Sequence, residues 1–304
     1  MKKQLILTID VGGTHVTTAL IDLGERSVVE GSLAREYFDS NLPKDTVLQH
    51  WLNAINHAMA WSGDHELEGV GICMPGPFDY QQGICWIKDQ DKYEHFYGVN
   101  IREELRNLLG FSLSFPILFE NDAACFGKGE VLRLPALQRQ RVIAMTLGTG
   151  LGGCFIENGL VLTDDPRVTK GGELYYLPYR DGIAEDYIST RALVNAYHQL
   201  TGIQLPNAKE IADRARSGDK AALECFHQMG IAIGEVLRPW INSFRPASLV
   251  LGGKISISAD LFLLSLQQEL KKAEVVPDVL VSIDNELAAL FGAAALFVDL
   301  ERVA

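Results

Sequence analysis

The chain has 304 residues, which is long for a single hydrophobic core and sufficient for two domains. Hydrophobic residues make up 47% of the sequence and charged residues 22%, a composition that excludes an intrinsically disordered chain. The 39 acidic and 27 basic residues give a formal net charge of -12, which disfavours binding to nucleic acids or to anionic membranes. A bound nucleotide would therefore depend on local donors such as backbone N–H groups.

The five cysteines are scattered along the sequence and form no Cys-x-x-Cys pair. This usage fits a reducing cytosol and argues against both a disulfide framework and a zinc knuckle. The two lysines and the short apolar run before Asp10 are too short for a signal peptide, and no run is long enough to span a membrane. We therefore expect a cytoplasmic protein without membrane partners.

Strands and helices alternate from the beginning of the chain. The segment QLILTIDVGGTHVTTALIDL (residues 4–23) predicts two strands joined by a Gly-Gly turn, because β-rich apolar runs flank the glycines. Apolar side chains at helical spacing predict a helix with one buried face over residues 45–61. The stretch GVGICMPGPFD (69–79) predicts a strand that ends in a Pro/Gly loop. A helix near 100–109 leads to the strand FPILF (115–119), which stops at the sequence END.

The second half of the chain repeats this plan. RVIAMTLGTGLGGCFIENGLVL (141–162) again predicts a strand, a glycine turn and a strand. The elements expected after it are helices near 185–200, 207–217 and 219–244 (kinked by Pro239), the buried strand ASLVLGG (247–253), a helix over 259–273, the strand VLVSI (279–283) and an apolar helix from Glu286. Alternating strands and helices predict an α/β protein, and two glycine hairpins predict two domains with a cleft between them.

Three glycine clusters lie at the ends of predicted strands. Glycine allows the backbone to turn and to approach a ligand closely, so that successive N–H groups converge on an anion. One such cluster could equally be a tight turn, whereas three at strand ends favour nucleotide binding. The clusters are Gly12, Gly13 and Thr14; Gly148, Thr149 and Gly150; and Gly252 and Gly253.

The sequence GTGLGG (148–153) also matches the dinucleotide-binding pattern G-x-G-x-x-G. That pattern requires a helix to begin at the glycines, whereas the following CFIENGLVL predicts another strand. The chain has no G-x-x-x-x-G-K-[ST] sequence, so a P-loop is excluded as well. We therefore expect β-hairpins to hold the phosphates.

Asp10 ends the first predicted strand, immediately before the first glycine cluster. A carboxylate beside bound phosphate is repulsive unless a cation intervenes, and Mg²⁺ prefers carboxylate, water and phosphate ligands. The alternative is an aspartate that caps a turn. The position of Asp10 beside the glycines favours the metal role.

The motifs DVGGT, END, GTGLGG and VLGG occur in this order and resemble those of the ROK sugar kinases, a family with the actin-like ATPase (ribonuclease H-like) fold. The resemblance extends from Asp10 to the last helix and implies two α/β domains that close on ATP and a sugar. The N-terminal domain would span residues 1–117, with a helix at about 287–304 packing back on it, and the larger C-terminal domain would span 118–286.

The resemblance also implies roles for individual residues. Asn121 would contact the sugar, and Asp122 would be the catalytic base. This role agrees with the chemistry, because a carboxylate can orient a poorly nucleophilic sugar hydroxyl and accept its proton. Asp122 could also be the N-cap of the following helix, and the two roles are compatible.

The resemblance also implies which residues bind the nucleotide. Asp10 would bind Mg²⁺, and phosphate would be bound by Gly12, Gly13, Thr14, Gly148, Thr149 and Gly150. Gly252 and Gly253 would bind the adenosine.

The sugar site of the family includes a glutamate in a G-E-x-G-H segment. Glu173 matches this glutamate, but the last two positions of the segment hold tyrosines, the second of them Tyr176. A second family glutamate, four residues before a serine, matches Glu185. Carboxylates suit sugars because each can accept hydrogen bonds from two vicinal hydroxyls. Gly76, in the Pro/Gly loop, is a further candidate for sugar contact.

Many family members hold a structural zinc ion through that histidine and a C-x-C-G-x-x-G-C run. This chain has Tyr176 in place of the histidine and no cysteine between Cys154 and Cys225, so we expect no structural zinc. The loop over residues 174–184 would then be ordered by packing of its tyrosines, which are Tyr175, Tyr176 and Tyr179.

The sequence therefore predicts an ATP-dependent kinase of a hexose hydroxyl, with the 6-hydroxyl of glucose or of a related aldose or glucoside as acceptor. The alternatives are a non-catalytic sugar-binding regulator and a degenerate kinase that binds sugar only. Family repressors carry an N-terminal DNA-binding segment, for which a first strand beginning by Leu5 leaves no room. Homodimers are common in the family, so a homodimer is expected here.

Overall fold

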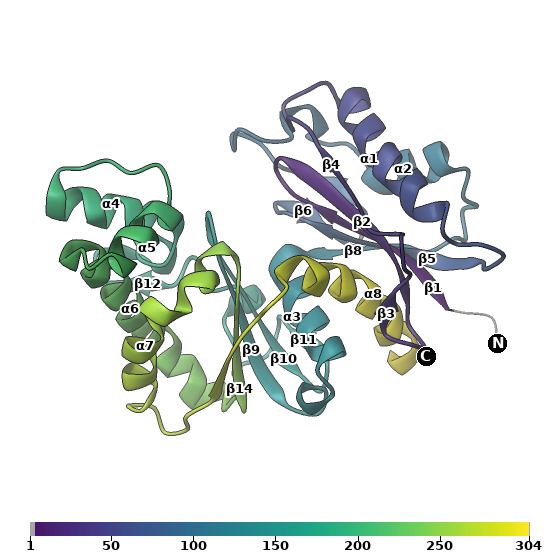
Figure 1. Ribbon diagram of the computed structural model, residues 1–304. Helices are drawn as coiled ribbons and strands as arrows, with labels where there is room; N and C mark the ends of the chain where they lie inside the picture. Colours follow the sequence, from purple (N-terminus) through teal and green to yellow (C-terminus); the bar gives the residue numbers. More distant parts are fainter. Residues whose placement is uncertain (1–3, 304) are drawn as a thin grey trace. The chain divides into compact units, whose positions relative to one another are not determined.

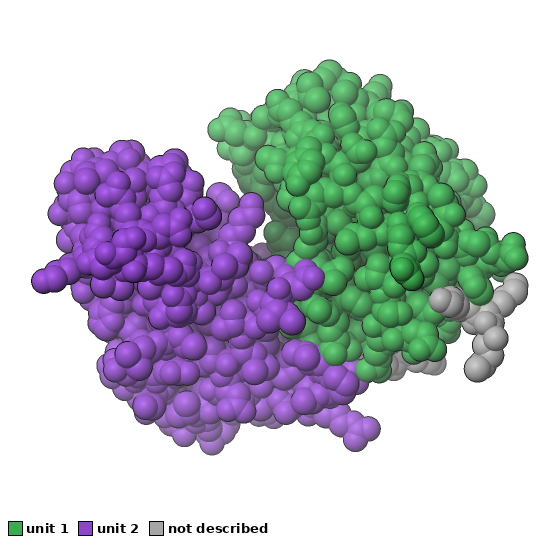
Figure 2. Space-filling model, in the orientation of Figure 1, with its two compact units in different colours: residues 1–133, 286–304 green, residues 134–285 purple. Residues whose placement is uncertain are grey.

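The computed structural model describes the backbone of residues 4–303 and the side chains of residues 4–298. The chain forms two compact units, each built around one main β-sheet (Figure 1). Unit 1 contains residues 1–133 and 286–304, and unit 2 contains residues 134–285 (Figure 2). Within the described part of the chain, no helix has the length and apolar character needed to cross a membrane.

Unit 1 is built on a sheet of six strands in the order β3-β2-β1-β5-β8, with β4 also paired to β2. The strands are β1 (Leu5–Val11), β2 (His15–Asp22), β3 (Ser27–Val28), β4 (Ala34–Tyr37), β5 (Leu67–Met74) and β8 (Ile117–Asn121). β1 and β2 form an antiparallel hairpin, whereas β1, β5 and β8 are parallel. The carboxyl ends of these three parallel strands therefore lie at one edge of the sheet.

Helices and short strands complete unit 1. They are α1 (Lys44–Met59), α2 (Ile101–Leu109), α3 (Asp122–Arg133), α8 (Asn285–Val303), the 3₁₀ turn η1 (Glu94–Phe96) and the hairpin of β6 (Phe78–Asp79) with β7 (Ile84–Cys85). α1 buries its apolar face, including Trp51, in the same core as β1 and β5. α2 begins where the Asn100 side chain accepts from the Glu103 N–H and ends at Gly110, because Gly110 adopts the left-handed conformation.

α8 packs against α3 and β5 through glycines that leave no room for a side chain. A Cβ atom at Gly129 of α3 would lie 1.7 Å from the carbonyl oxygen of Ala288, and one at Gly292 would lie 1.7 Å from that of Cys125. Glycine is required where two backbones approach this closely. The C-terminal helix thereby fixes the helix that begins at Asp122.

Unit 2 has a sheet of five strands in the order β11-β10-β9-β14-β15. The strands are β9 (Arg141–Leu147), β10 (Leu151–Glu157), β11 (Leu160–Leu162), β14 (Ser248–Gly252) and β15 (Asp278–Val281). β9, β10 and β11 are antiparallel neighbours, whereas β9, β14 and β15 are parallel. Each unit thus combines a glycine hairpin with parallel strands, as expected from the repeated sequence plan.

The helices of unit 2 are α4 (Thr190–Thr201), α5 (Ala208–Arg216), α6 (Lys220–Phe244) and α7 (Leu263–Leu270). The shorter elements are η2 (Pro135–Leu137), η3 (Lys170–Gly172), η4 (Ala184–Asp186), η5 (Lys254–Leu261) and the hairpin of β12 (Pro178–Tyr179) with β13 (Gly182–Ile183). α4 begins five residues after the predicted start at 185, because the Ser189 side chain caps it. The helix predicted over 259–273 is divided between η5 and α7.

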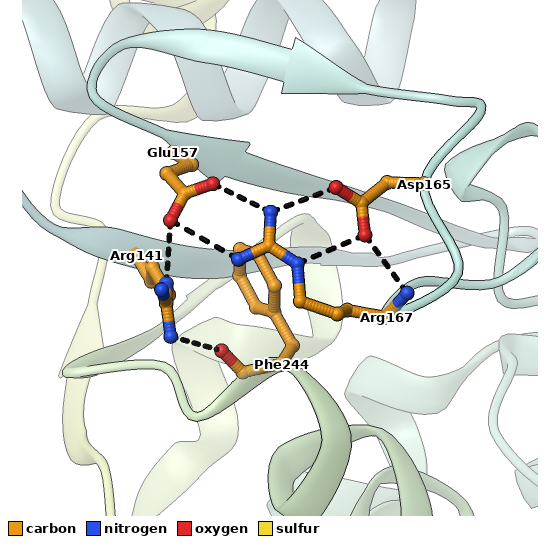
Figure 3. A network of polar contacts seen from close by, with 5 residues as sticks. All are labelled: Arg141, Glu157, Asp165, Arg167 and Phe244. Carbon is orange, nitrogen blue, oxygen red and sulfur yellow. Dashed lines mark hydrogen bonds and ion pairs between the residues drawn. The ribbon is translucent and has the colours of Figure 1, made fainter.

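Two cations tie the β9–β10 hairpin of unit 2 to neighbouring segments (Figure 3). Arg167 Nη2 lies 2.7 Å from Glu157 Oε2 and 2.7 Å from Asp165 Oδ2. Arg141 Nε lies 2.6 Å from Glu157 Oε1, and its Nη1 donates to the carbonyl oxygen of Phe244 at the end of α6. Glu157 therefore joins the loop after β11 to Arg141 of β9, and Arg141 in turn joins β9 to the end of α6.

The units differ from the expected domains at residues 118–133 and at residue 286. Residues 118–133, which the sequence assigned to the C-terminal domain, belong to unit 1. The reason is that β8 pairs with β5 and that α3 meets α8 through Gly129 and Gly292. All five cysteines are buried as free thiols, three in unit 1 and two in unit 2.

Candidate functional site

The predicted site residues of unit 1 meet at the carboxyl edge of its sheet. Asp10 is the penultimate residue of β1, Asn121 ends β8, and Asp122 is the first residue of α3. The predicted phosphate residues Gly12, Gly13 and Thr14 form the turn between β1 and β2. A Cβ atom at Gly13 would meet nothing within 4 Å, so the backbone of this turn is open to a ligand.

Asp10 and Asp122 influence each other electrostatically. Burial and the neighbouring charge of Asp122 raise the pKa of Asp10 from 3.8 to about 7, while Arg35 acts in the opposite direction. Solvent reaches Asp122, but the surrounding protein removes enough water to raise the pKa of this carboxyl also. Two carboxyl groups with raised pKa values, at the same edge of the sheet, form a site that tends to bind either protons or a cation.

The start of α3 presents the Asp122 carboxylate. The Ala123 N–H lies 2.9 Å from Asp122 Oδ1 and 3.0 Å from Asn121 Oδ1, so both side chains cap the helix. The Ala123 N–H bond to Asp122 and the positive charge of Lys92 act against the effect of burial on the pKa of Asp122. The capping role and a catalytic role are compatible, because Asp122 as a residue remains exposed to solvent.

Tyr80 joins this cluster and was not predicted from the sequence. Its hydroxyl accepts from Asn121 Nδ2 at 3.2 Å and donates to the Met74 carbonyl oxygen at 3.1 Å. A Cβ atom at Gly76 would lie 3.4 Å from the same hydroxyl, so the predicted sugar residues Gly76 and Asn121 both lie next to the Tyr80 hydroxyl. The only local signal was its position four residues after Gly76 in the Pro/Gly loop.

Tyr93 was also missed, and it fastens the first glycine turn. Its buried hydroxyl donates to the Gly12 carbonyl oxygen at 2.6 Å, and its ring packs edge-on against Trp51 and Phe96. The turn beside Asp10 is therefore anchored to the aromatic core of unit 1.

The two glycine clusters of unit 2 are neighbours. Gly148 follows the end of β9, and its N–H donates to the Gly150 carbonyl oxygen at 3.1 Å. Gly253 follows β14 with φ 84°, and a Cβ atom there would lie 2.3 Å from the carbonyl oxygen of Leu147. Parallel pairing of β9 with β14 thus brings the predicted phosphate and adenosine residues together.

Glu185 packs against the Gly148–Gly150 loop. Its Oε2 accepts from the Leu151 N–H at 3.0 Å and would lie 2.6 Å from a Cβ atom at Gly150. Arg191 Nη2 lies 3.5 Å from its Oε1. The structure therefore brings Glu185, which the sequence assigned to the sugar, next to a predicted phosphate loop.

The sequence matches the ROK family over residues 6–299. The chain belongs to the ROK family. It is 25% identical to the glucokinase of Thermotoga maritima, covering 88% of this chain and 88% of that protein. It is 28% identical to the N-acetyl-D-glucosamine kinase of Haemophilus influenzae, covering 95% of this chain and 98% of that protein.

Solved structures of ROK proteins share the fold. A ROK hexokinase from Thermus thermophilus has a TM-score of 0.80 and 22% identity over 98% of this chain and all of that one. A ROK glucokinase from Streptomyces griseus, in complex with glucose and AMPPNP, has a TM-score of 0.73 and 23% identity over 96% of this chain and 98% of that one. The fold is that of the actin-like ATPases, as the motifs predicted.

This ROK chain orders the segment around Tyr176 through aromatic contacts. Tyr176 donates to the Lys170 carbonyl oxygen at 2.8 Å and packs edge-on against Tyr175. Tyr179 packs edge-on against Tyr187 at 5.0 Å between ring centroids and donates to Glu235 Oε2. The tyrosines named from the sequence thus contribute to the order of this loop, together with Tyr187.

Glu173 lies just before these tyrosines and is exposed, although partial desolvation raises the pKa of its carboxyl. Among the side chains of residues 4–298, no group of three or more His, Cys, Asp or Glu is placed to hold a metal ion. A Mg²⁺ ion held by Asp10 would therefore need phosphate or water oxygens to complete its shell, which is the usual arrangement for Mg²⁺ with nucleotides.

Proposed function

We propose that this ROK protein is an ATP-dependent sugar kinase that transfers the γ-phosphate of ATP to a hydroxyl of a hexose, with Asp122 as the general base. The observation that carries the proposal is the position of Asp10 and Asp122 at one sheet edge, beside the turn of Gly12 and Gly13. The similarity to glucokinases and N-acetylglucosamine kinases supports it.

In this reaction the Asp122 carboxylate accepts the proton of a sugar hydroxyl while the sugar oxygen attacks the γ-phosphorus. The new bond joins the sugar oxygen to phosphorus, the bond to the β,γ-bridging oxygen breaks, and ADP leaves with that electron pair. A pKa raised above the usual carboxyl value makes Asp122 a stronger base near neutral pH.

Asp10 would hold Mg²⁺ together with phosphate oxygens of ATP, and the metal ion would neutralise phosphate charge. The raised pKa of Asp10 fits this role, because a cation there would stabilise the carboxylate against the effects of burial and of the Asp122 charge. The remaining nucleotide ligands would be backbone groups, which suits an acidic chain. We assign phosphate to Gly12, Gly13, Thr14, Gly148, Thr149 and Gly150, and adenosine to Gly252 and Gly253.

For the acceptor, we propose the 6-hydroxyl of glucose or of a related aldose or glucoside. Asn121 precedes Asp122, and both Asn121 and Gly76 lie beside the Tyr80 hydroxyl, which supports their assignment to the sugar. We further assign sugar contacts to Glu173, Tyr176 and Glu185 by their correspondence to family positions.

We also propose a cytoplasmic homodimer without structural zinc and without nucleic-acid or membrane partners. The free thiols fit the compartment, and the net charge of -12 fits the absence of nucleic-acid and membrane partners.

The proposal is tested by coupled measurement of ADP release across a panel of hexoses. We expect at least one sugar to raise the rate above background, and Asp122→Asn to lower kcat by about 10²- to 10⁴-fold while the KM values change little. Asp64→Asn, which changes an exposed aspartate in the turn after α1, serves as the matched control. A sugar-independent rate, or an Asp122→Asn variant with wild-type activity, would contradict the proposal.

A non-catalytic sugar sensor is the second candidate. The chain is also 24% identical to the xylose repressor of Bacillus spizizenii, over 86% of this chain and 67% of that protein. A sensor would bind sugar without turning ATP over. Sugar-dependent thermal stabilisation without ADP release would therefore favour it over a kinase.

A further inference from the structure

The hydrogen bonds around Asn121 determine which end of its amide faces which neighbour. A backbone N–H can only donate, so the atom of Asn121 that lies 3.0 Å from the Ala123 N–H must be its oxygen. A carbonyl oxygen can only accept, so the Tyr80 hydroxyl proton lies on its bond to Met74. The Tyr80 oxygen therefore accepts from Asn121 Nδ2.

Tyr80 is itself held in place from several sides. Its ring packs against Phe78 at 5.3 Å between centroids. Arg102 of α2 donates to the Gln81 carbonyl oxygen at 2.8 Å and to that of Ile117 at 3.1 Å, which fastens the loop after Tyr80 to the start of β8. The tyrosine hydroxyl is thus a fixed acceptor for Asn121.

Among the described residues, this arrangement uses the Asn121 oxygen and one of its two amide protons, so the second amide proton is left for a ligand. We propose that Tyr80 is a positioning residue that fixes the Asn121 amide as a hydrogen-bond donor to the sugar, beside the acceptor Asp122. The inference rests on the proposed function and deepens it. The sugar oxygen that meets Asn121 must then accept, whereas the hydroxyl that meets Asp122 must donate.

Tyr80→Phe removes only the hydroxyl and keeps the ring against Phe78. Without its acceptor, the Asn121 amide loses its fixed orientation, and we expect the KM for the sugar to rise roughly 5- to 30-fold, in the range for loss of one hydrogen bond. The kcat and the KM for ATP should change by less than about twofold, because the interaction is made equally in the ground and transition states. Tyr97→Phe, at an exposed tyrosine of the same unit, is the matched control.

A double-mutant cycle separates action through Asn121 from a general structural effect. In the Asn121→Ala background, Tyr80→Phe should leave the KM for the sugar unchanged, because the amide that it positions is absent. The same rise in KM in both backgrounds would overturn the proposal.

A measurement without sugar keeps this inference distinct from the proposed function. In protein labelled with ¹⁵N-asparagine, the Asn121 side-chain signals, assigned by their loss in Asn121→Ala, should shift and exchange faster with water in Tyr80→Phe but not in Tyr97→Phe. Unchanged Asn121 signals in Tyr80→Phe would overturn the positioning role. Shifted signals in a protein that phosphorylates no sugar would support the positioning role and refute only the kinase proposal.

Discussion

Asp10 of unit 1 has a raised pKa, and the residues paired with it across the sheet bear on that pKa. Its strand partner on β2 is Thr17, which in turn pairs with Arg35 on β4, so the three side chains share one face of the sheet. Thr17 and Arg35 both donate to Glu286, at the start of α8. Arg35 thus pairs with Glu286, and its effect on the pKa of Asp10 is smaller than the opposing effects of burial and of Asp122.

The raised pKa of Asp10 predicts how the stability of the free protein varies with pH. Between pH 3.8 and about 7 the folded state binds more protons at this site than the unfolded state, so the free energy of unfolding falls as pH rises through this window. Between about pH 5 and about pH 8, the wild type should lose roughly 2–3 kcal/mol more than Asp10→Asn, as an upper limit.

Urea unfolding of both proteins at the two pH values, with a chelator and without nucleotide, measures this difference. Groups that do not interact with Asp10 contribute nearly equally to both proteins and cancel, whereas Asp122 contributes through its interaction with Asp10. Parallel dependence of the two free energies on pH would show that Asp10 is not desolvated in the free protein.

At the scale of elements, the contact between α3 and α8 sets the position of the proposed base. Asp122 is the first residue of α3, and one turn later the Cys125 carbonyl oxygen touches Gly292 of α8. Further along α3, Gly129 touches the Ala288 carbonyl oxygen. Because both contacts are between backbones, any side chain at either glycine must move α3 relative to α8.

Gly129→Ala should therefore lower both stability and activity. The added Cβ atom would lie 1.7 Å from the Ala288 carbonyl oxygen, and overpacking of this kind costs about 1–3 kcal/mol. Movement of α3 should also lower kcat, because catalysis depends on the position of Asp122. Gly24→Ala is the control, since its Cβ atom would meet Asp22 Oδ1 at an ordinary 3.4 Å. Wild-type stability and kcat in Gly129→Ala would contradict this account.

At the scale of the whole molecule, the two units differ in how the chain builds them. Unit 2 is one continuous segment, and the members of its large core cluster all lie between residues 143 and 270. Unit 1 is built from two separate segments of the chain. One of its hydrophobic core clusters joins Ile6, Ala19 and Ile21 of the N-terminal hairpin to residues of α8 such as Leu290 and Phe291.

Residues 134–285 alone should fold cooperatively, whereas residues 1–133 alone should not, because they lack the apolar face of α8. Joining 1–133 to 286–304 through a Gly/Ser linker should restore folding. Circular dichroism and urea unfolding of the three fragments test this expectation. Cooperative unfolding of the 1–133 fragment by itself would refute it.

The sequence predicted the strand ends and glycine turns well because these signals are local. Asp10, Asn121 and Asp122 could be placed at strand ends from their flanking apolar runs, and parallel strands then bring such residues to one edge. The alternation of strands and helices also predicted the class of fold.

The sequence could not predict Tyr80 or Tyr93, because each acts through a partner distant in the chain. Tyr80 is 41 residues from Asn121, and Tyr93 is 81 residues from Gly12. The assignment of α3 to unit 1 was missed for the same reason, since it depends on pairing of β8 with β5 and on a glycine contact with α8. Such tertiary contacts leave no periodicity in the sequence.

The burial of all five cysteines gives the protein an intrinsic reporter of local opening. A buried thiol reacts with a modifying reagent only when the surrounding structure opens, so the rate of alkylation at each cysteine measures the free energy of that opening. Cys73, Cys85 and Cys125 report on unit 1, and Cys154 and Cys225 report on unit 2. Mass spectrometry of the alkylated peptides would thus resolve which unit a substitution or a bound ligand stabilises, without any introduced label.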